Sequence, residues 1–161
     1  MAADLPGDGA VPEHAQLVHG AGLEQDDREA GGGRGREHEH EAQRRAPVVV
    51  LDLHAEATSE KVALSRWLDG RVTAVIGTHT HVQTNDARIL PAGTAAVTDA
   101  GMTGPHDSVI GVVAELAIRR MRTRLPVRFQ PAEGGVRIEG VVVDCTDDGR
   151  AERIELLRLE V

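Results

Sequence analysis

Aromatic residues are almost absent from this chain, which has one Trp, one Phe and no Tyr among its 161 residues. Any core must therefore be built from Val, Leu, Ile and Ala. The scarcity also removes the aromatic platforms on which single-stranded nucleic acids stack. The net charge is −8, whereas proteins that bind nucleic-acid phosphates usually carry clusters of Lys and Arg. We therefore expect no DNA partner. A small anionic substrate is still compatible, because a bound metal ion supplies positive charge locally.

Cysteine and long apolar runs are also scarce. Cys145 is the single cysteine, so no disulfide forms within the chain, and we expect a buried, inert thiol in a reducing compartment. The first residues do not show the basic segment and apolar run of a secretory signal. No stretch approaches the ~18 apolar residues of a membrane span. We therefore expect a cytoplasmic protein without a membrane partner.

The composition changes near residue 46. Residues 1–45 contain eight glycines and ten acidic residues, and their few aliphatic side chains follow neither a helical nor a strand period. Such a segment buries too little apolar surface to offset the entropy of ordering it. We interpret residues 1–46 as a disordered or non-homologous arm and residues 47–161 as a folded α/β domain.

The folded part alternates strands and helices, as an α/β chain does. The expected elements are a strand over 47–54, a helix over 60–68, strands over 71–78 and 94–98, a helix over 108–125, and strands over 127–130, 136–145 and 151–161. Thr58 is predicted to cap the first helix. Asp147-Asp148-Gly149 is typical of the hairpin turn between the last two strands. The initial strand–helix–strand order favours two neighbouring parallel strands.

Three histidines follow the ends of the first two expected strands. His54 ends the first, and His79 and His81 follow the second in Gly77-Thr78-His79-Thr80-His81. Residues two apart on an extended chain point the same way, and neighbouring parallel strands end at one sheet edge. Converging imidazoles suit Zn, Fe or Mn. The alternative from spacing alone is that these are surface or capping histidines.

Ligating imidazoles need partners for their other ring nitrogens, and the nearby acidic residues Asp52 and Asp99 are the candidates. Other polar segments are weaker signals. Arg36 to Glu41, with alternating Glu and His, is interpreted as a solvated charged tract. The glycines of loop 99–105 suggest backbone close to a ligand, although turns also need them. His106 receives no role.

Four segments together resemble one protein family. They are LDLHAEATSEKVAL (51–64), DGRVTAVIGTHTHVQTNDARILPAGTAAVTDAGMTGPHDSVIG (69–111), IRRMRTRLPVRFQPA (118–132) and GVVVDCTDDGRAERIELL (140–157). They are similar to the YmdB family of calcineurin-like metallophosphoesterases, associated with 2′,3′-cyclic nucleotide 2′-phosphodiesterase activity. The resemblance implies the C-terminal half of a four-layer α/β sandwich. It also identifies the His54 segment as the family's later histidine block, although Asp52-Leu53-His54 imitates an opening D-x-H motif.

The resemblance implies a two-metal site. His54 and His79 match ligands of one ion, and His81 matches a ligand of the other; the ions are iron or manganese. Such a pair activates water for attack on a small phosphodiester and neutralises the phosphate oxygens. The resemblance assigns no catalytic residue beyond these ligands.

Residues 1–45 do not match the family's remaining ligands. These are an Asp after a first strand, a bridging Glu in an Asn-Gly-Glu-Asn-like motif, and the Asn of an Asn-His pair, whose His assists the leaving group. Without the bridging carboxylate, nothing offsets the repulsion between two close cations. We expect at most one weakly bound ion and no activity of this chain by itself, and we hypothesise that residues 1–45 are translated out of frame or from a misplaced start.

Three interpretations of the chain stay open: a phosphodiesterase, a non-catalytic fragment, and a histidine-based metal-binding module. A half-sandwich also exposes a sheet face, which predicts association between copies.

Overall fold

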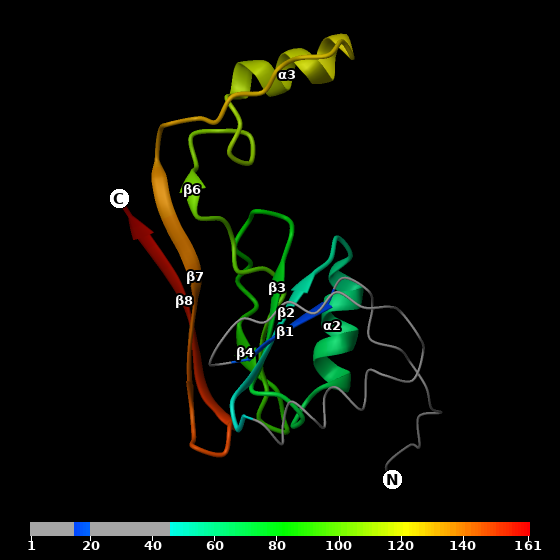
Figure 1. Ribbon diagram of the computed structural model, residues 1–161, viewed down its shortest axis with the longest axis vertical. Helices are drawn as coiled ribbons and strands as arrows, with labels where there is room; N and C mark the ends of the chain where they lie inside the picture. Colours follow the sequence, from blue (N-terminus) through cyan, green and yellow to red (C-terminus); the bar gives the residue numbers. More distant parts are fainter. Residues whose placement is uncertain (1–14, 20–45) are drawn as a thin grey trace.

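The computed structural model describes residues 15–19 and 46–161. Figure 1 shows a helix packed on a sheet, with a long hairpin on the sheet's other side. The strands are β1 (Ala15–His19), β2 (Val49–His54), β3 (Ala74–Thr78), β4 (Arg88–Ile89), β5 (Ala95–Val97), β6 (Gly104–Pro105), β7 (Val136–Cys145) and β8 (Ala151–Glu160), and the helices are α2 (Thr58–Trp67) and α3 (Ala114–Thr123). This confirms the expected α/β class.

The larger sheet has the order β1-β2-β3-β5-β4, and the smaller has the order β6-β7-β8. Strands β2, β3 and β5 are parallel neighbours, and His54 at the end of β2 pairs in register with Thr78 at the end of β3. The carboxyl ends of these strands therefore share one edge of the sheet, as the sequence predicted.

Apolar residues on the two faces of the large sheet form two cores. On one face, Val49, Leu51 and Leu53 of β2 pack with Val75 and with the α2 side chains Leu64 and Trp67. On the other face, Ala74 and Ala95 of the sheet pack with the hairpin residues Ala151, Val143 and Ile154. Burying each leucine contributes about 1.5–3 kcal/mol. The cores fix β2 and β3, and so the edge where they end.

Helix α2 departs from expectation at its start and on its buried face. Thr58 is the first helical residue and not the cap, because the N-cap position is Ala57, which makes no side-chain capping hydrogen bond. The buried positions of α2 are Lys61 and Ser65, one turn apart. A buried lysine was not predicted.

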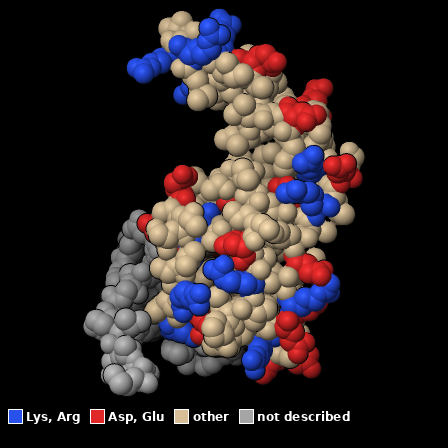
Figure 2. Space-filling view, turned by 180° about the vertical axis from the view of Figure 1, so that it is seen from behind, with Lys and Arg blue, Asp and Glu red and all other residues tan. Residues whose placement is uncertain are grey.

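The region from 106 to 135 extends away from the two sheets and carries α3 (Figure 1). Figure 2 shows Lys and Arg side chains gathered at that end. The helix expected over 108–125 begins only at Ala114, because Val109 and Val112 bridge across a tight turn that ends at Gly111 (φ +94°). The strand expected over 127–130 is wrong: Pro131 makes one isolated bridge to Val112 instead.

The N-terminal arm was expected to lack regular structure, but the structure contains a strand at Ala15–His19. These residues form β1, which pairs antiparallel with β2 from Ala15 opposite Leu53 to His19 opposite Val49. The rest of 1–45, including the Arg36–Glu41 tract, lies outside the described residues. Within the part of the chain that the structure describes, no helix is long and apolar enough to cross a membrane.

Candidate metal centre

His54 and His79 meet where β2 and β3 end. His54 Nε2 lies 2.9 Å from His79 Nδ1. The ring centroids are 4.7 Å apart, and the ring planes are nearly perpendicular, at 81°. His79 is 41% exposed. Two of the three predicted ligands are therefore adjacent and open to solvent.

The tautomer of His54 follows from its neighbours. The Thr78 hydroxyl donates to Asp52 Oδ1 at 2.9 Å, and the same hydroxyl oxygen lies 3.1 Å from His54 Nδ1. A hydroxyl has one hydrogen, so a Thr78 oxygen that donates to Asp52 accepts from the Nδ1–H of His54. In the neutral ring, this leaves the lone pair on His54 Nε2. Asp52 thus orients His54 through Thr78, not by direct contact.

His79 is oriented by a carboxylate from the segment that precedes α2. Its Nε2 lies 2.8 Å from Glu56 Oε2. A carboxylate accepts and does not donate, so His79 Nε2 carries the hydrogen, and in the neutral ring the lone pair is on Nδ1.

Two lone pairs therefore face each other across 2.9 Å. Such an arrangement is repulsive unless a proton or a metal ion lies between or beside the two nitrogens. Two nitrogens this close could both reach one cation, because metal–imidazole bonds are about 2.0–2.1 Å long. The donor chemistry and spacing of His54 and His79 fit shared coordination of one cation.

His81 does not join this pair. Within residues 15–19 and 46–161, no three or more His, Cys, Asp or Glu side chains converge closely enough to hold one metal ion. The extended geometry assumed for the two histidines after β3 is wrong, because φ is +111° at His79 and +63° at His81. The alternation of an extended chain therefore does not apply beyond Thr78.

A buried ion pair holds the turn between these histidines. Asp99 Oδ2 accepts from the backbone N–H of Thr80 at 2.9 Å, from its hydroxyl at 2.8 Å, and from Lys61 Nζ at 3.1 Å. Burial raises the pKa of Asp99, but hydrogen bonds from Thr80, Gly101 and Lys61 outweigh it and lower the pKa below its usual value. Asp99 therefore supports the site through Thr80 and not as a partner of a histidine ring.

The small sheet anchors the loops that flank the site. Gln83 Nε2 lies 3.0 Å from the carbonyl oxygens of both Gly140 and Leu157, on β7 and β8. Glu139 Oε2 accepts from the backbone N–H of Met102 at 3.2 Å. The hairpin thus fixes both the segment after His81 and loop 99–105.

Asp86 ties the end of β5 to the segment after the histidines. Its Oδ1 accepts from the Thr98 N–H and hydroxyl, both at 3.0 Å, and from the Thr84 hydroxyl at 2.9 Å. Burial raises the pKa of Asp86, but these bonds and the charge of Arg88 outweigh it and lower the pKa.

His106 and Cys145 lie outside the histidine pair. His106 Nε2 lies 3.1 Å from the Met102 carbonyl oxygen, which indicates a role in loop packing. Cys145 is partly exposed and not buried as expected.

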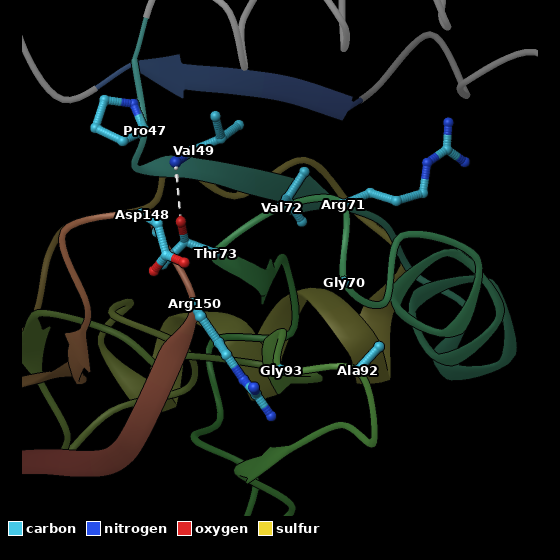
Figure 3. A pocket seen from close by; sticks show the side chains of 11 residues that line it. Pro47, Val49, Gly70, Arg71, Val72, Thr73, Ala92, Gly93, Asp148 and Arg150 are labelled. Carbon is cyan, nitrogen blue, oxygen red and sulfur yellow. Dashed lines mark hydrogen bonds between the residues drawn. The ribbon is translucent and has the colours of Figure 1, made fainter.

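A cavity of about 580 Å³ lies at the other end of β2 and β3, where these strands begin (Figure 3). Its charged lining residues are Arg71, Asp148 and Arg150, and the two arginine side chains point away from each other in Figure 3. None of its lining residues within 15–19 and 46–161 is a histidine. Its size does not make it the reaction site, because the groups that match metal chemistry are at the opposite edge.

Comparison with known proteins identifies a family. Residues 36–157 match the model of a family described as YmdB-like protein, a match that begins within the N-terminal arm. The chain is 56% identical over 115 residues to the 2′,3′-cyclic-nucleotide 2′-phosphodiesterase of Bacillus subtilis (strain 168). This match covers 71% of the chain and 44% of that relative.

Two crystal structures have a similar fold. A hypothetical protein from Thermus thermophilus has a TM-score of 0.68 and 43% identity, with 74% of this chain and 50% of that chain covered. A novel phosphatase from Mycoplasma pneumoniae has a TM-score of 0.64 and 40% identity, with 68% and 40% covered. The chain thus spans half or less of the length of these relatives, which fits the expected half of the four-layer sandwich.

Proposed function

This chain belongs to the YmdB-like family. We propose that the sheet edge that carries His54 and His79 is part of a metal-dependent site that hydrolyses small phosphodiesters. The B. subtilis relative is named for 2′,3′-cyclic-nucleotide 2′-phosphodiesterase activity, so cyclic nucleotides are the proposed substrate class. The chain spans 44% of that relative's length, and the activity of the whole protein is part of the proposal.

The 2.9 Å approach of His54 Nε2 to His79 Nδ1 supports this proposal most directly. In the proposed site, these two nitrogens hold one divalent ion, iron or manganese, and His81 belongs to a second ion in the intact family fold. A bound ion of this kind lowers the pKa of water and neutralises phosphate charge.

The protein's own residues fix the ligands in place. Thr78 and Asp52 hold His54 with Nε2 free, and Glu56 holds His79 with Nδ1 free. Partners of this kind raise ligand basicity and set ring orientation. For this chain by itself we propose at most one weakly bound ion.

A histidine-based metal-binding module without turnover is the second candidate. The observation in its favour is that only two of the three predicted ligands meet, and that no cluster of three metal-binding side chains occurs among residues 15–19 and 46–161. A single ion without a second cation to balance the leaving oxygen is a weaker phosphodiesterase catalyst.

An activity assay separates the two candidates. The purified chain is incubated with Mn²⁺ and a 2′,3′-cyclic nucleotide, alongside His79→Ala. Turnover that depends on Mn²⁺ and disappears in His79→Ala supports the enzyme. Binding of about one ion per chain without turnover contradicts it for this chain and supports the binding module.

A cytoplasmic location, no DNA partner and association between copies complete the proposal. Apolar side chains exposed on the β7–β8 hairpin favour association; they are Ile138, Val142 and Leu159.

A further inference from the structure

Thr80 lies between His79 and His81 and is held by a single carboxylate. Both flanking histidines have positive φ, a region that residues other than glycine adopt infrequently and that costs backbone energy. At this turn the constraint comes from Asp99, whose Oδ2 accepts hydrogen bonds from both the N–H and the hydroxyl of Thr80. Two bonds to one residue fix the backbone on both sides of it.

We propose that the buried Lys61–Asp99 pair is a positioning clamp, which holds Thr80 and so fixes the turn that places His79 against His54. Lys61 and Asp99 do not touch the metal themselves. The link to metal binding rests on the proposed function, whereas the effect on the turn does not.

The Lys61–Asp99 pair is better explained by the need to hold a backbone segment than by a gain in overall stability. Lys61 is 2% exposed and Asp99 is 1% exposed, and Lys61 is the only lysine in the chain. Removing two charges from water has a large desolvation cost, so well-packed apolar residues are often at least as stable as a buried ion pair. The charged pair is explained if its carboxylate must hold a particular backbone segment.

The path of Lys61 depends on Gly77. A Cβ at Gly77 would lie 3.0 Å from Lys61 Cδ and 1.9 Å from the carbonyl oxygen of Thr98. Glycine near the end of β3 therefore lets the lysine pass from α2 to Asp99. Gly77 thus makes room for the Lys61 side chain, which reaches Asp99 and places its ammonium group next to the carboxylate that holds Thr80.

Amide hydrogen exchange tests the clamp without a metal. In Thr80→Val, which loses the hydroxyl bond, and in Lys61→Met, which loses the cation, we expect the amide of residue 80 to exchange about tenfold faster or more. The amide of the buried β3 residue Val75 reports global opening and is expected to change less. Ser65→Ala is the matched control, because Ser65 is buried on the same helix face and its hydroxyl donates to the Lys61 carbonyl oxygen.

Equal acceleration at positions 75 and 80 would show that the pair supports only global stability, and unchanged exchange at position 80 would show that it holds nothing there; either overturns the clamp. If Lys61→Met does not fold, the exchange rates of Thr80→Val alone test the clamp. This variant is expected to fold because residue 80 is exposed.

Co²⁺ titration tests the link to metal binding. We expect the dissociation constant to rise about tenfold in Thr80→Val and Lys61→Met, with altered visible bands at saturation, while Ser65→Ala matches the wild type. Affinity and bands unchanged in both variants would overturn the link. A wild-type chain that binds no Co²⁺ contradicts the proposed function, and the exchange result still decides whether the clamp exists.

Discussion

His54 Nε2 lies 2.9 Å from His79 Nδ1, although the other nitrogen of each ring already has an acceptor. Two neutral rings held in this way oppose each other with lone pairs. A proton or a metal ion between the two nitrogens removes the repulsion, so the geometry is compatible with a shared cation. This relationship links the strand register, which places His54 beside Thr78, to the proposed chemistry.

The bridge from Asp52 through Thr78 to His54 should control metal affinity. Thr78→Val removes the hydroxyl that fixes the His54 tautomer, and we expect the dissociation constant for Mn²⁺ to rise about 10-fold or more, as for other partners of metal-bound histidines. Thr78→Ser is the matched control, because it keeps the hydroxyl. Isothermal titration calorimetry measures both. Equal affinities for the valine and serine variants would contradict the role of the bridge.

Gly77 should tolerate no side chain. A Cβ there would lie 1.9 Å from the Thr98 carbonyl oxygen, so Gly77→Ala is expected to lower the free energy of unfolding by about 3 kcal/mol or more. A Cβ at Gly140 meets nothing within 4 Å, and Gly140→Ala is the control with little expected loss. Urea denaturation followed by circular dichroism compares them. Similar midpoints would show that the close approach at Gly77 is absent.

Acid should weaken the chain partly through Asp86. Burial raises the pKa of Asp86, but hydrogen bonds from Thr98 and Thr84 outweigh it and lower the folded-state pKa below the ordinary value of 3.8. Its stabilising contribution is therefore complete above the unfolded-state pKa and is lost as the pH falls through the lower folded-state pKa.

Asp86→Asn tests this pH dependence. We expect urea midpoints measured between pH 6 and about pH 2 to fall less steeply for Asp86→Asn than for the wild type. Parallel curves would contradict the assignment.

The core elements were predictable because their sequences carry periodic or turn signals. The apolar run that ends at His54 gives β2, and Asp147-Asp148-Gly149 gives the β7–β8 turn, where Gly149 has φ +85°. The shared edge followed from parallel pairing, which sets His54 beside Thr78 and lets His79 meet His54.

Other features depend on contacts that no local pattern encodes. A lysine in a short helix such as α2 is expected to face solvent, and the burial of Lys61 depends on Asp99, which is 38 positions away. The apolar spacing before Ala114 resembles a helix, but a hydrogen bond from Gly111 N–H to Ser108 Oγ closes a turn instead. The turned backbone at His79 likewise depends on Asp99.

Metal titration of the chain tests the central claim most directly. His38 and His40 are first replaced by Ala, so that the charged tract containing them contributes no background binding. Mn²⁺ binding by this variant is then compared with binding by the same variant carrying His54→Ala or His79→Ala. We expect about one ion per chain, lost with either further substitution. Equal binding by all three proteins would contradict a metal site at the histidine pair.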